Sequence, residues 1–263
     1  MVKPEKSLFE SIKEFFKTIF YALLIAGLIR TLFFQPFWIP SGSMKPNLLI
    51  GDYIFVNKFV YGYSKYSCPF SLCPVKGRFF YSEPDRGDVV VFRHPVNGKD
   101  YVKRLIGLPG DEVLIKDGRL YINKHKVQTK KIDDFVEEKS KQGPHGSMPR
   151  CSNSPVSLGA NCKKRQYLEK ITDQIEIRTL DISDDEYGDN TTSFKVPNGE
   201  FFFLGDNRDN SLDSRWGRVV DGVGFVKAEN LIGRADGILF SAAGKKIWYF
   251  WTWRKDRFFK AVN

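Results

Sequence analysis

The sequence predicts a mainly β protein with a single helix near its N-terminus. An unbroken apolar run at residues 18–29 predicts the helix. Beyond it, short apolar or alternating runs are separated by Gly, Pro, Asn and Asp, a pattern typical of strands. A polar segment interrupts these runs. We therefore expect a largely antiparallel β-sheet core that carries an inserted subdomain.

The apolar run is expected to anchor the chain in a membrane as one transmembrane helix. Its 12 residues would suit a cleaved signal peptide, but the apolar pattern continues to Ile39 and no small-x-small cleavage site follows it. Arg30 can reach the far interface, and Pro36 then ends the helix. Four lysines precede the run and predict a cytoplasmic N-terminus: Lys3, Lys6, Lys13 and Lys17. A cleaved signal peptide and a buried soluble helix are the alternatives.

Eight strands are predicted beyond the helix. They cover residues 53–60, 88–92, 101–106, 112–116, 119–122, 201–204, 222–227 and 231–240. The clearest hairpin turns at Asp117-Gly118, because this dipeptide tolerates the positive φ values of a type I′ turn.

Changes in composition divide the chain into five predicted segments. Residues 123–198 begin basic, become polar around two cysteines and turn acidic from 173 to 189, which indicates a more solvated insertion. The strands on either side of it are expected to pair with one another. The segments are a cytoplasmic stretch (1–17), the anchor (18–35), the core (36–112 and 199–244), the insertion (113–198) and a basic aromatic C-terminal segment (245–263).

The charge balance points to a membrane surface as partner. The chain carries 41 Lys+Arg against 31 Asp+Glu, and its 42% hydrophobic residues exclude a disordered chain. The net charge of +10 is not spread as a nucleic-acid face would require, because four cations precede the anchor and six accompany the C-terminal aromatics. No nucleic-acid partner is expected. The C-terminal segment could equally be a final core strand with a solvated basic tail.

The four cysteines form two pairs that are close in sequence. Cys68 with Cys73 and Cys151 with Cys162 would each close a short loop, so we predict two disulfides in an oxidising compartment. Free thiols, other pairings and a zinc site are the alternatives. Zinc is disfavoured because neither spacing is Cys-x-x-Cys and no histidine has ligand spacing beside them, so no metal is expected.

Polar and ionisable residues that could carry chemistry are concentrated in four stretches. These are 40–46 (Pro-Ser-Gly-Ser-Met-Lys-Pro), 86–92, 101–111 with a lysine inside a strand pattern, and 205–215 (Gly-Asp-Asn-Arg-Asp-Asn-Ser-Leu-Asp-Ser-Arg). Taken singly, each has a structural explanation: a turn, a core strand, an outward-facing lysine or a polar loop after an apolar strand.

Together, in this order behind an apolar segment, the four stretches resemble the bacterial type I signal (leader) peptidases, membrane-anchored proteases of the Ser-Lys class. The combination of residues 41–44 with 205–215 is far more specific than either stretch alone. The resemblance covers the anchor, 36–112 and 199–236. The family's variable β-rich insertion matches this chain in position only, and the second anchoring helix that many members have is not seen here.

The resemblance implies a serine endopeptidase in which Ser43 is the nucleophile and Lys103 the general base. It gives Ser41 an oxyanion-hole role and lets Ser211 orient the lysine. The supporting ion pair is Asp213 with Arg215, and Asp206 and Arg208 hold the same loop.

The resemblance also implies the substrates and the location. Substrates are secreted preproteins with small residues at positions −1 and −3, cleaved at the outer (periplasmic) face of the bacterial inner membrane by a single-pass enzyme that needs no cofactor. The −1 pocket would contain Ile39, Met44, Leu48 and Tyr101, and the −3 pocket Phe37, Ile54, Val91 and Val102. A hydrophobic-core role explains these eight residues equally well.

A serine and a lysine can perform this chemistry only in a desolvated site. Serine is a weak nucleophile that needs a base within hydrogen-bond reach. At a reference pKa near 10.4, roughly one lysine in 2,500 is neutral at pH 7, so burial must lower the pKa of Lys103. Two other classes remain: a soluble Ser-Lys self-cleaving regulator, which would lack the anchor, and a membrane-tethered polyanion-binding module, which would leave residues 205–215 unexplained.

Overall fold

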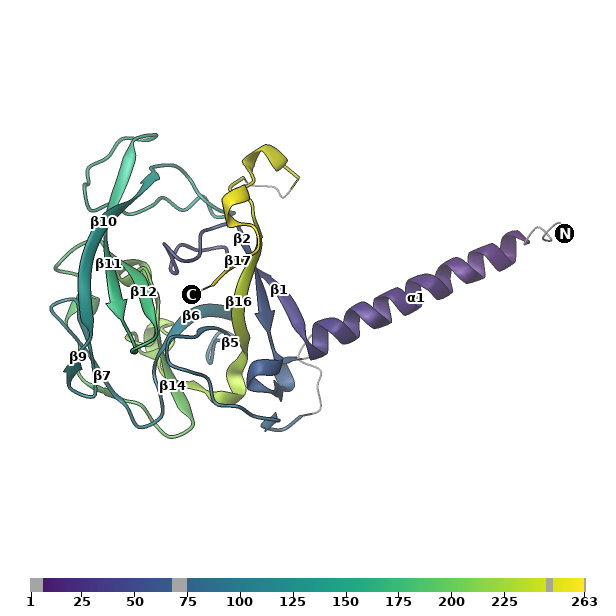
Figure 1. Cartoon of the computed structure of the whole chain (residues 1–263), viewed down its shortest axis with the longest axis horizontal. Coiled ribbons are helices and arrows are strands. Elements are labelled where there is room, and N and C mark those ends of the chain that lie inside the picture. Colours follow the sequence, from purple (N-terminus) through teal and green to yellow (C-terminus); the bar gives the residue numbers. More distant parts are fainter. Residues whose placement is uncertain (1–6, 68–74, 245–247, 263) are drawn as a thin grey trace.

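The computed structural model describes residues 7–67, 75–244 and 248–262. One long helix, α1 (Leu8–Leu32), projects from a β-rich body (Figure 1). Ser7 caps it, because its hydroxyl accepts a hydrogen bond from the Glu10 N–H while the Glu10 carboxylate accepts one from the Ser7 N–H. The mainly β class with antiparallel sheets is confirmed.

No helix in the described part of the chain is long and apolar enough to cross a membrane. The predicted transmembrane anchor at residues 18–35 is therefore not supported by the structure. The helix also ends earlier than predicted, at Leu32, because the next residues form strand β1 (Phe34–Trp38). Pro36 lies inside this strand. It is tolerated there because β1 is at the edge of its sheet, where a missing N–H leaves no ladder hydrogen bond unmade.

The main sheet has eight strands in the order β1-β2-β16-β5-β6-β14-β15, and β17 pairs with β16. Strands before and after the polar segment pair as predicted, β5 with β16 and β6 with β14. The further bounds are β2 (Asp52–Asn57), β5 (Val89–Arg93), β6 (Asp100–Gly107), β14 (Glu200–Leu204), β15 (Val226–Lys227), β16 (Leu231–Ser241) and β17 (Lys260–Ala261).

Three smaller sheets accompany it. A four-stranded sheet has the order β13 (Phe194–Lys195), β7 (Glu112–Lys116), β8 (Arg119–Ile122), β9 (His125–Lys126), and a pair joins β3 (Tyr63–Ser64) to β4 (Arg78–Phe79). The third contains β10 (Gln128–Glu138), β11 (Asn161–Lys170) and β12 (Glu176–Asp181). These last three strands were not predicted, because β11 buries polar side chains such as Lys164 and Glu169 where an alternating strand would carry apolar ones.

The predicted hairpin and most strands are present, with two corrections. Asp117 (φ 49°) and Gly118 (φ 66°) connect β7 to β8 in the expected two-residue turn. The strand predicted at 53–60 stops at Asn57, where a 3₁₀ turn follows, and that predicted at 222–227 shrinks to β15 because residues 217–224 form a hydrogen-bonded loop. Short 3₁₀ helices cover Phe59–Tyr61, Lys65–Ser67, Tyr187–Asp189, Arg208–Asn210, Arg218–Val220, Ala228–Asn230, Phe250–Thr252 and Lys255–Arg257.

The C-terminal segment packs onto the core, and part of its charge is structural. Arg257 forms an ion pair with Asp52 at 2.6 Å, and Arg254 donates to the Ser241 hydroxyl at 2.9 Å. These two cations therefore belong to the fold, and the short strand β17 pairs with β16, which agrees in part with the alternative of a final core strand. Large aromatics remain exposed at Trp248, Phe250, Trp251 and Phe259, while Lys245 and Lys246 lie outside the described residues.

Candidate active site

The buried side chains of Ser43 and Lys103 contact each other at the main sheet. Lys103 is in the middle of β6, and Ser43 follows β1 in the turn that leads to β2. The Lys103 Nζ lies 2.7 Å from the Ser43 Oγ and 3.2 Å from the Val102 carbonyl oxygen. Only 4% of Lys103 and 8% of Ser43 are exposed to solvent. The two groups are thus in hydrogen-bond contact and almost fully buried.

This setting makes Lys103 a much weaker base than a surface lysine. Burial lowers its pKa from 10.5 to about 8, although the nearby Asp213 and Asp206 carboxylates oppose the change by favouring the ammonium form. A lysine with this pKa is neutral in roughly one molecule in ten at pH 7. The neutral amine can accept the Ser43 proton.

A cavity of about 460 Å³ opens onto this pair. Its lining includes five of the eight predicted pocket residues: Phe37, Ile39, Met44, Tyr101 and Val102. The other three, Leu48, Ile54 and Val91, are fully buried in the hydrophobic cluster around Met44 and do not line the cavity. For them the core role applies. Six lining residues were not predicted: Trp38, Pro40, Lys99, Asp100, Asn210 and Leu212.

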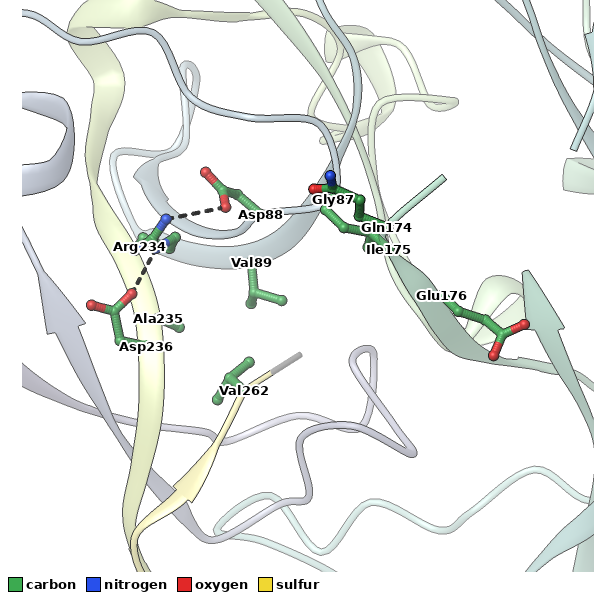
Figure 2. Close-up of a pocket in the computed structure, with 10 residues that line it drawn as sticks. All are labelled: Gly87, Asp88, Val89, Gln174, Ile175, Glu176, Arg234, Ala235, Asp236 and Val262. Atoms are coloured by element: carbon green, nitrogen blue, oxygen red, sulfur yellow. Dashed lines mark hydrogen bonds and ion pairs between the residues drawn. The ribbon is translucent and has the colours of Figure 1, made fainter. Parts of the chain in front are cut away.

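A second cavity, of about 580 Å³, lies between β5, β16 and the turn before β12 (Figure 2). Arg234 in its wall forms an ion pair with Asp236 at 2.7 Å and approaches Asp88 at 3.6 Å. None of its ten lining residues carries a hydroxyl or thiol group. In the described residues, no cluster of His, Cys, Asp and Glu could hold a metal ion. The smaller cavity, which contains the serine and the lysine, is therefore the candidate active site.

The two supporting serines occupy different environments. Ser41 is exposed, and its Oγ lies 3.5 Å from the Ser43 Oγ. Ser211 is buried against Gly205, where any Cβ would come within 2.1 Å of the Ser211 Oγ and 2.7 Å of the Ser43 carbonyl oxygen. Within the described residues, the Ser211 Oγ makes no well-oriented hydrogen bond, although the Asp213 carboxylate is a polar neighbour. The structure brings Ser211 beside the site without a bond to Lys103.

Ion pairs fix the loop at residues 205–215. Asp213 and Arg215 form the pair that the resemblance implied, at 2.9 Å. Burial alone would raise the pKa of Asp213, but the Arg215 charge and its hydrogen bonds outweigh burial and hold the pKa below its usual value. Asp206 receives both Nε and Nη2 of Arg104 at 2.8 Å. No local sequence pattern points to this partner, which lies 102 residues away.

Arg208 pairs with a residue of the polar segment, 39 positions away in the sequence. Its two terminal nitrogens donate to both carboxylate oxygens of Glu169 on β11, at 2.8 and 2.5 Å. Both side chains are buried, and a bidentate contact of this kind fixes the direction of the guanidinium plane. The polar segment therefore holds the loop that borders the site.

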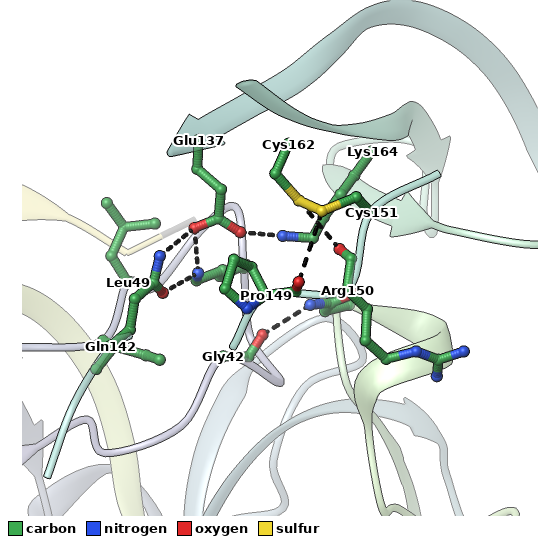
Figure 3. Close-up of polar contacts among 12 residues, drawn as sticks. Gly42, Leu49, Glu137, Gln142, Pro149, Arg150, Cys151, Cys162 and Lys164 are labelled. Carbon is green, nitrogen blue, oxygen red and sulfur yellow. Dashed lines mark hydrogen bonds and ion pairs between the residues drawn. A yellow bond between two sulfur atoms is a disulfide. The ribbon is translucent and has the colours of Figure 1, made fainter. Parts of the chain in front are cut away.

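The turn that carries Ser43 is held by the same segment (Figure 3). Lys45, two residues after the nucleophile candidate, donates to Glu137 at 2.5 Å and to Gln142 at 2.6 Å. Glu137 also pairs with Lys164, so one carboxylate serves two lysines that are both buried. The Lys45 side chain runs directly under Gly42, which in turn accepts a hydrogen bond from the Asn207 side chain at 2.9 Å.

A disulfide joins Cys151 to Cys162 beside these contacts (Figure 3). This is the pairing that the spacing predicted, whereas Cys68 and Cys73 lie outside the described residues. Arg150, the neighbour of Cys151, donates to the Asp209 carbonyl oxygen at 2.7 Å. The disulfide loop thereby also contacts the 205–215 loop.

Comparison with known proteins identifies the family. A family profile described as "Signal peptidase, peptidase S26" matches residues 12–240. The chain belongs to this family. A protein named Signal peptidase I from Rickettsia canadensis (strain McKiel) is 40% identical over 235 residues, which cover 86% of this chain and 78% of the relative. Its namesake from Rickettsia rickettsii (strain Sheila Smith) is 42% identical over 224 residues, 84% of this chain and 77% of that one.

A solved structure of a signal peptidase I from Enterococcus faecalis V583 overlaps 58% of this chain and 97% of its own, with 28% identity and a TM-score of 0.30. The profile and the relatives establish that this member of the signal peptidase family is a peptidase that acts on signal peptides.

Proposed function

We propose that this chain is a membrane-associated serine endopeptidase that uses Ser43 and Lys103 to remove N-terminal signal peptides from secreted preproteins. The observation that carries the proposal is the 2.7 Å approach of a buried lysine amine to a buried serine hydroxyl. Burial supplies the neutral amine that the chemistry needs, because it lowers the pKa of Lys103 to about 8.

In this mechanism, Lys103 accepts the Ser43 proton as the Ser43 Oγ attacks the scissile carbonyl carbon. The resulting oxyanion receives hydrogen bonds from the Ser43 N–H and the Ser41 hydroxyl, and each such donor is worth roughly 3 to 4 kcal/mol in the transition state. The Lys103 ammonium then protonates the leaving amine, which leaves an acyl-enzyme on Ser43. Water deprotonated by Lys103 attacks the ester, and collapse of the second tetrahedral intermediate frees the cleaved signal peptide and restores the Ser43 hydroxyl.

The substrate binds as an extended chain along the cavity. The residues that line it come from the end of β1 and from β6, two strands whose backbones can offer an added peptide hydrogen bonds. The apolar walls at Ile39, Met44 and Val102 suit the small side chains expected at −1 and −3. In this assignment, residues 36–112 and 199–244 form the catalytic core, and the 113–198 insertion braces it.

Membrane lipid is the second partner. Large apolar side chains are exposed along α1, among them Phe16, Phe20, Leu23 and Ile25. A helix with so much exposed apolar surface gains free energy in an apolar environment. For the catalytic core we propose the location that the family resemblance implies, the outer face of the bacterial inner membrane, with α1 in contact with lipid.

The test uses the full chain in detergent with a secreted preprotein as substrate. Ser43→Ala and Lys103→Ala should each lower kcat/KM by about 10⁴-fold or more, with unchanged circular dichroism. Ser157→Ala and Lys116→Ala, both at exposed positions, are the matched controls and should process normally. Full activity in either site variant would refute the mechanism.

A further inference from the structure

An apolar hollow adjoins the candidate active site on the side of the 205–215 loop. It has a volume of about 560 Å³ and is lined by Tyr187, Leu212, Arg215, Trp216, Gly217 and Val220. Leu212 also lines the cavity that contains Ser43, and 40% of this side chain is exposed. The two hollows therefore share Leu212 in their walls.

The floor of the hollow is fixed in place. The rings of Tyr187 and Trp216 stack with centroids 5.3 Å apart. The Trp216 indole N–H donates to the Ser211 carbonyl oxygen at 3.2 Å, so the indole is tied to the loop that borders the active site. Arg215 contributes little free charge, because it is paired with Asp213. The floor is thus an ordered and largely apolar surface.

A tight loop holds two valines beside this floor. Residues 217–224 are crossed by hydrogen bonds from the Gly222 N–H to the Gly217 carbonyl and from the Gly224 N–H to the Trp216 carbonyl, each 3.1 Å. A Cβ on Gly222 would come within 2.2 Å of the Trp216 carbonyl oxygen, so the loop depends on glycine there. Val219 is 99% exposed and Val220 60% exposed. Rigid apolar residues presented to water in this way are typical of a binding surface.

We propose that this surface, formed by Tyr187, Leu212, Trp216 and Val220, binds the first residues of the substrate that follow the scissile bond and favours apolar or aromatic side chains there. The inference rests on the proposed function. The β1 and β6 residues of the active-site cavity are assigned to the signal-peptide side. The loop residues at its other boundary, Asn210 and Leu212, are then left for the mature side. Ser43 and Leu212 line the same cavity, so an extended substrate that continues past the scissile bond on the loop side meets Leu212.

A peptide is favoured over lipid as the occupant because the hollow shares Leu212 with the cavity that must receive the scissile peptide. The chemistry of the hollow also matches an extended chain with one or two apolar side chains, since aromatic floor and aliphatic wall meet beside a paired guanidinium. Lipid binding is retained as an outcome of the test.

The experiment compares two peptide substrates with the full chain in detergent. The two peptides have the same sequence up to and including position +1. They differ only at positions +2 to +4, which carry only Leu and Phe in the apolar peptide and only Ser in the polar one. We expect the apolar peptide to have about tenfold higher kcat/KM, from partial burial of its side chains. In Val220→Ser this ratio should fall below about threefold, while Leu158→Ser, an exposed apolar residue of the disulfide loop, should keep it.

Each outcome decides the inference. If the wild type cleaves both peptides with nearly equal kcat/KM, the inference that this surface binds the mature side of the substrate is wrong, and the proposed function still stands. If the wild type cleaves neither peptide, both the inference and the proposed function are wrong. If Val220→Ser keeps the ratio but lowers binding to anionic phospholipid vesicles, the surface binds lipid and the inference is wrong.

Discussion

Lys103→Met removes a buried ammonium group and keeps an unbranched side chain of similar length. Folding lowers the pKa of Lys103 from 10.5 to about 8 because the site is desolvated. At pH 7 the folded protein therefore holds this proton less readily than the unfolded chain does, and the buried charge costs stability. We expect the variant to be inactive yet more stable than its parent at pH 7.

The size of the gain follows from the two pKa values. A fall from 10.5 to about 8 corresponds to about 3 kcal/mol at pH 7. The lost hydrogen bond to Ser43 offsets about 1 kcal/mol, which leaves a net gain of about 2 kcal/mol. Because the pKa is lowered on folding, the parent regains stability as the pH rises from 8 towards 10.5. At pH 10 the two proteins should agree within about 1 kcal/mol.

Urea unfolding monitored by tryptophan fluorescence at pH 7 and pH 10 measures both quantities. Lys116→Met, on the exposed end of β7, is the control and should change stability little at either pH. A Lys103→Met variant that is less stable than its parent at pH 7, or whose gain is the same at both pH values, would contradict the account of a desolvated lysine.

Three further outcomes are expected. The kcat/KM of the wild type should rise with pH, with an apparent pKa near 8 that belongs to Lys103. An apparent pKa near 10 would mean that burial does not lower the pKa of this lysine. Glu137→Gln leaves the two buried lysines, Lys45 and Lys164, without their shared carboxylate and should lower the free energy of unfolding by about 3 kcal/mol. The control Glu138→Gln, at an exposed position, should lower it by less than about 0.5 kcal/mol. Equal effects of the two substitutions would show that Glu137 does not stabilise this part of the fold. Cys162→Ser opens the loop closed by Cys151 and should cost about 3 kcal/mol, and in dithiothreitol the wild type and the variant should unfold with the same midpoint.

Elements with local signals could be predicted from the sequence. The Asp117-Gly118 turn and the apolar strand β5 are read directly from neighbouring residues, and the structure contains both. The helix was placed correctly near the N-terminus, but its end was not, because the aromatic residues after Leu32 suit an edge strand as well as an apolar helix. The local sequence pattern does not distinguish an edge strand from a continued helix at these residues.

Features that depend on distant partners could not be predicted. Strands β10 to β12 carry buried polar side chains, and only the location of Glu137, Glu169 and their cationic partners explains why such residues face inward. The polar segment was expected to be solvated, yet it supplies the ion pairs that hold both loops of the candidate site. Ser43 and Lys103 were found from their motifs, but their separation of 2.7 Å comes only from the fold.

The ion pair between Arg257 and Asp52 has a consequence for the order in which the chain is made. The two residues are separated by 205 positions, and Arg257 also donates to the Asn47 carbonyl oxygen, four residues beyond Ser43. While the chain is being translated, its N-terminal helix and its serine leave the ribosome long before this arginine does. The turn that carries Ser43 therefore acquires this support only after Arg257 has been synthesised, so a shorter nascent chain holds that turn less firmly.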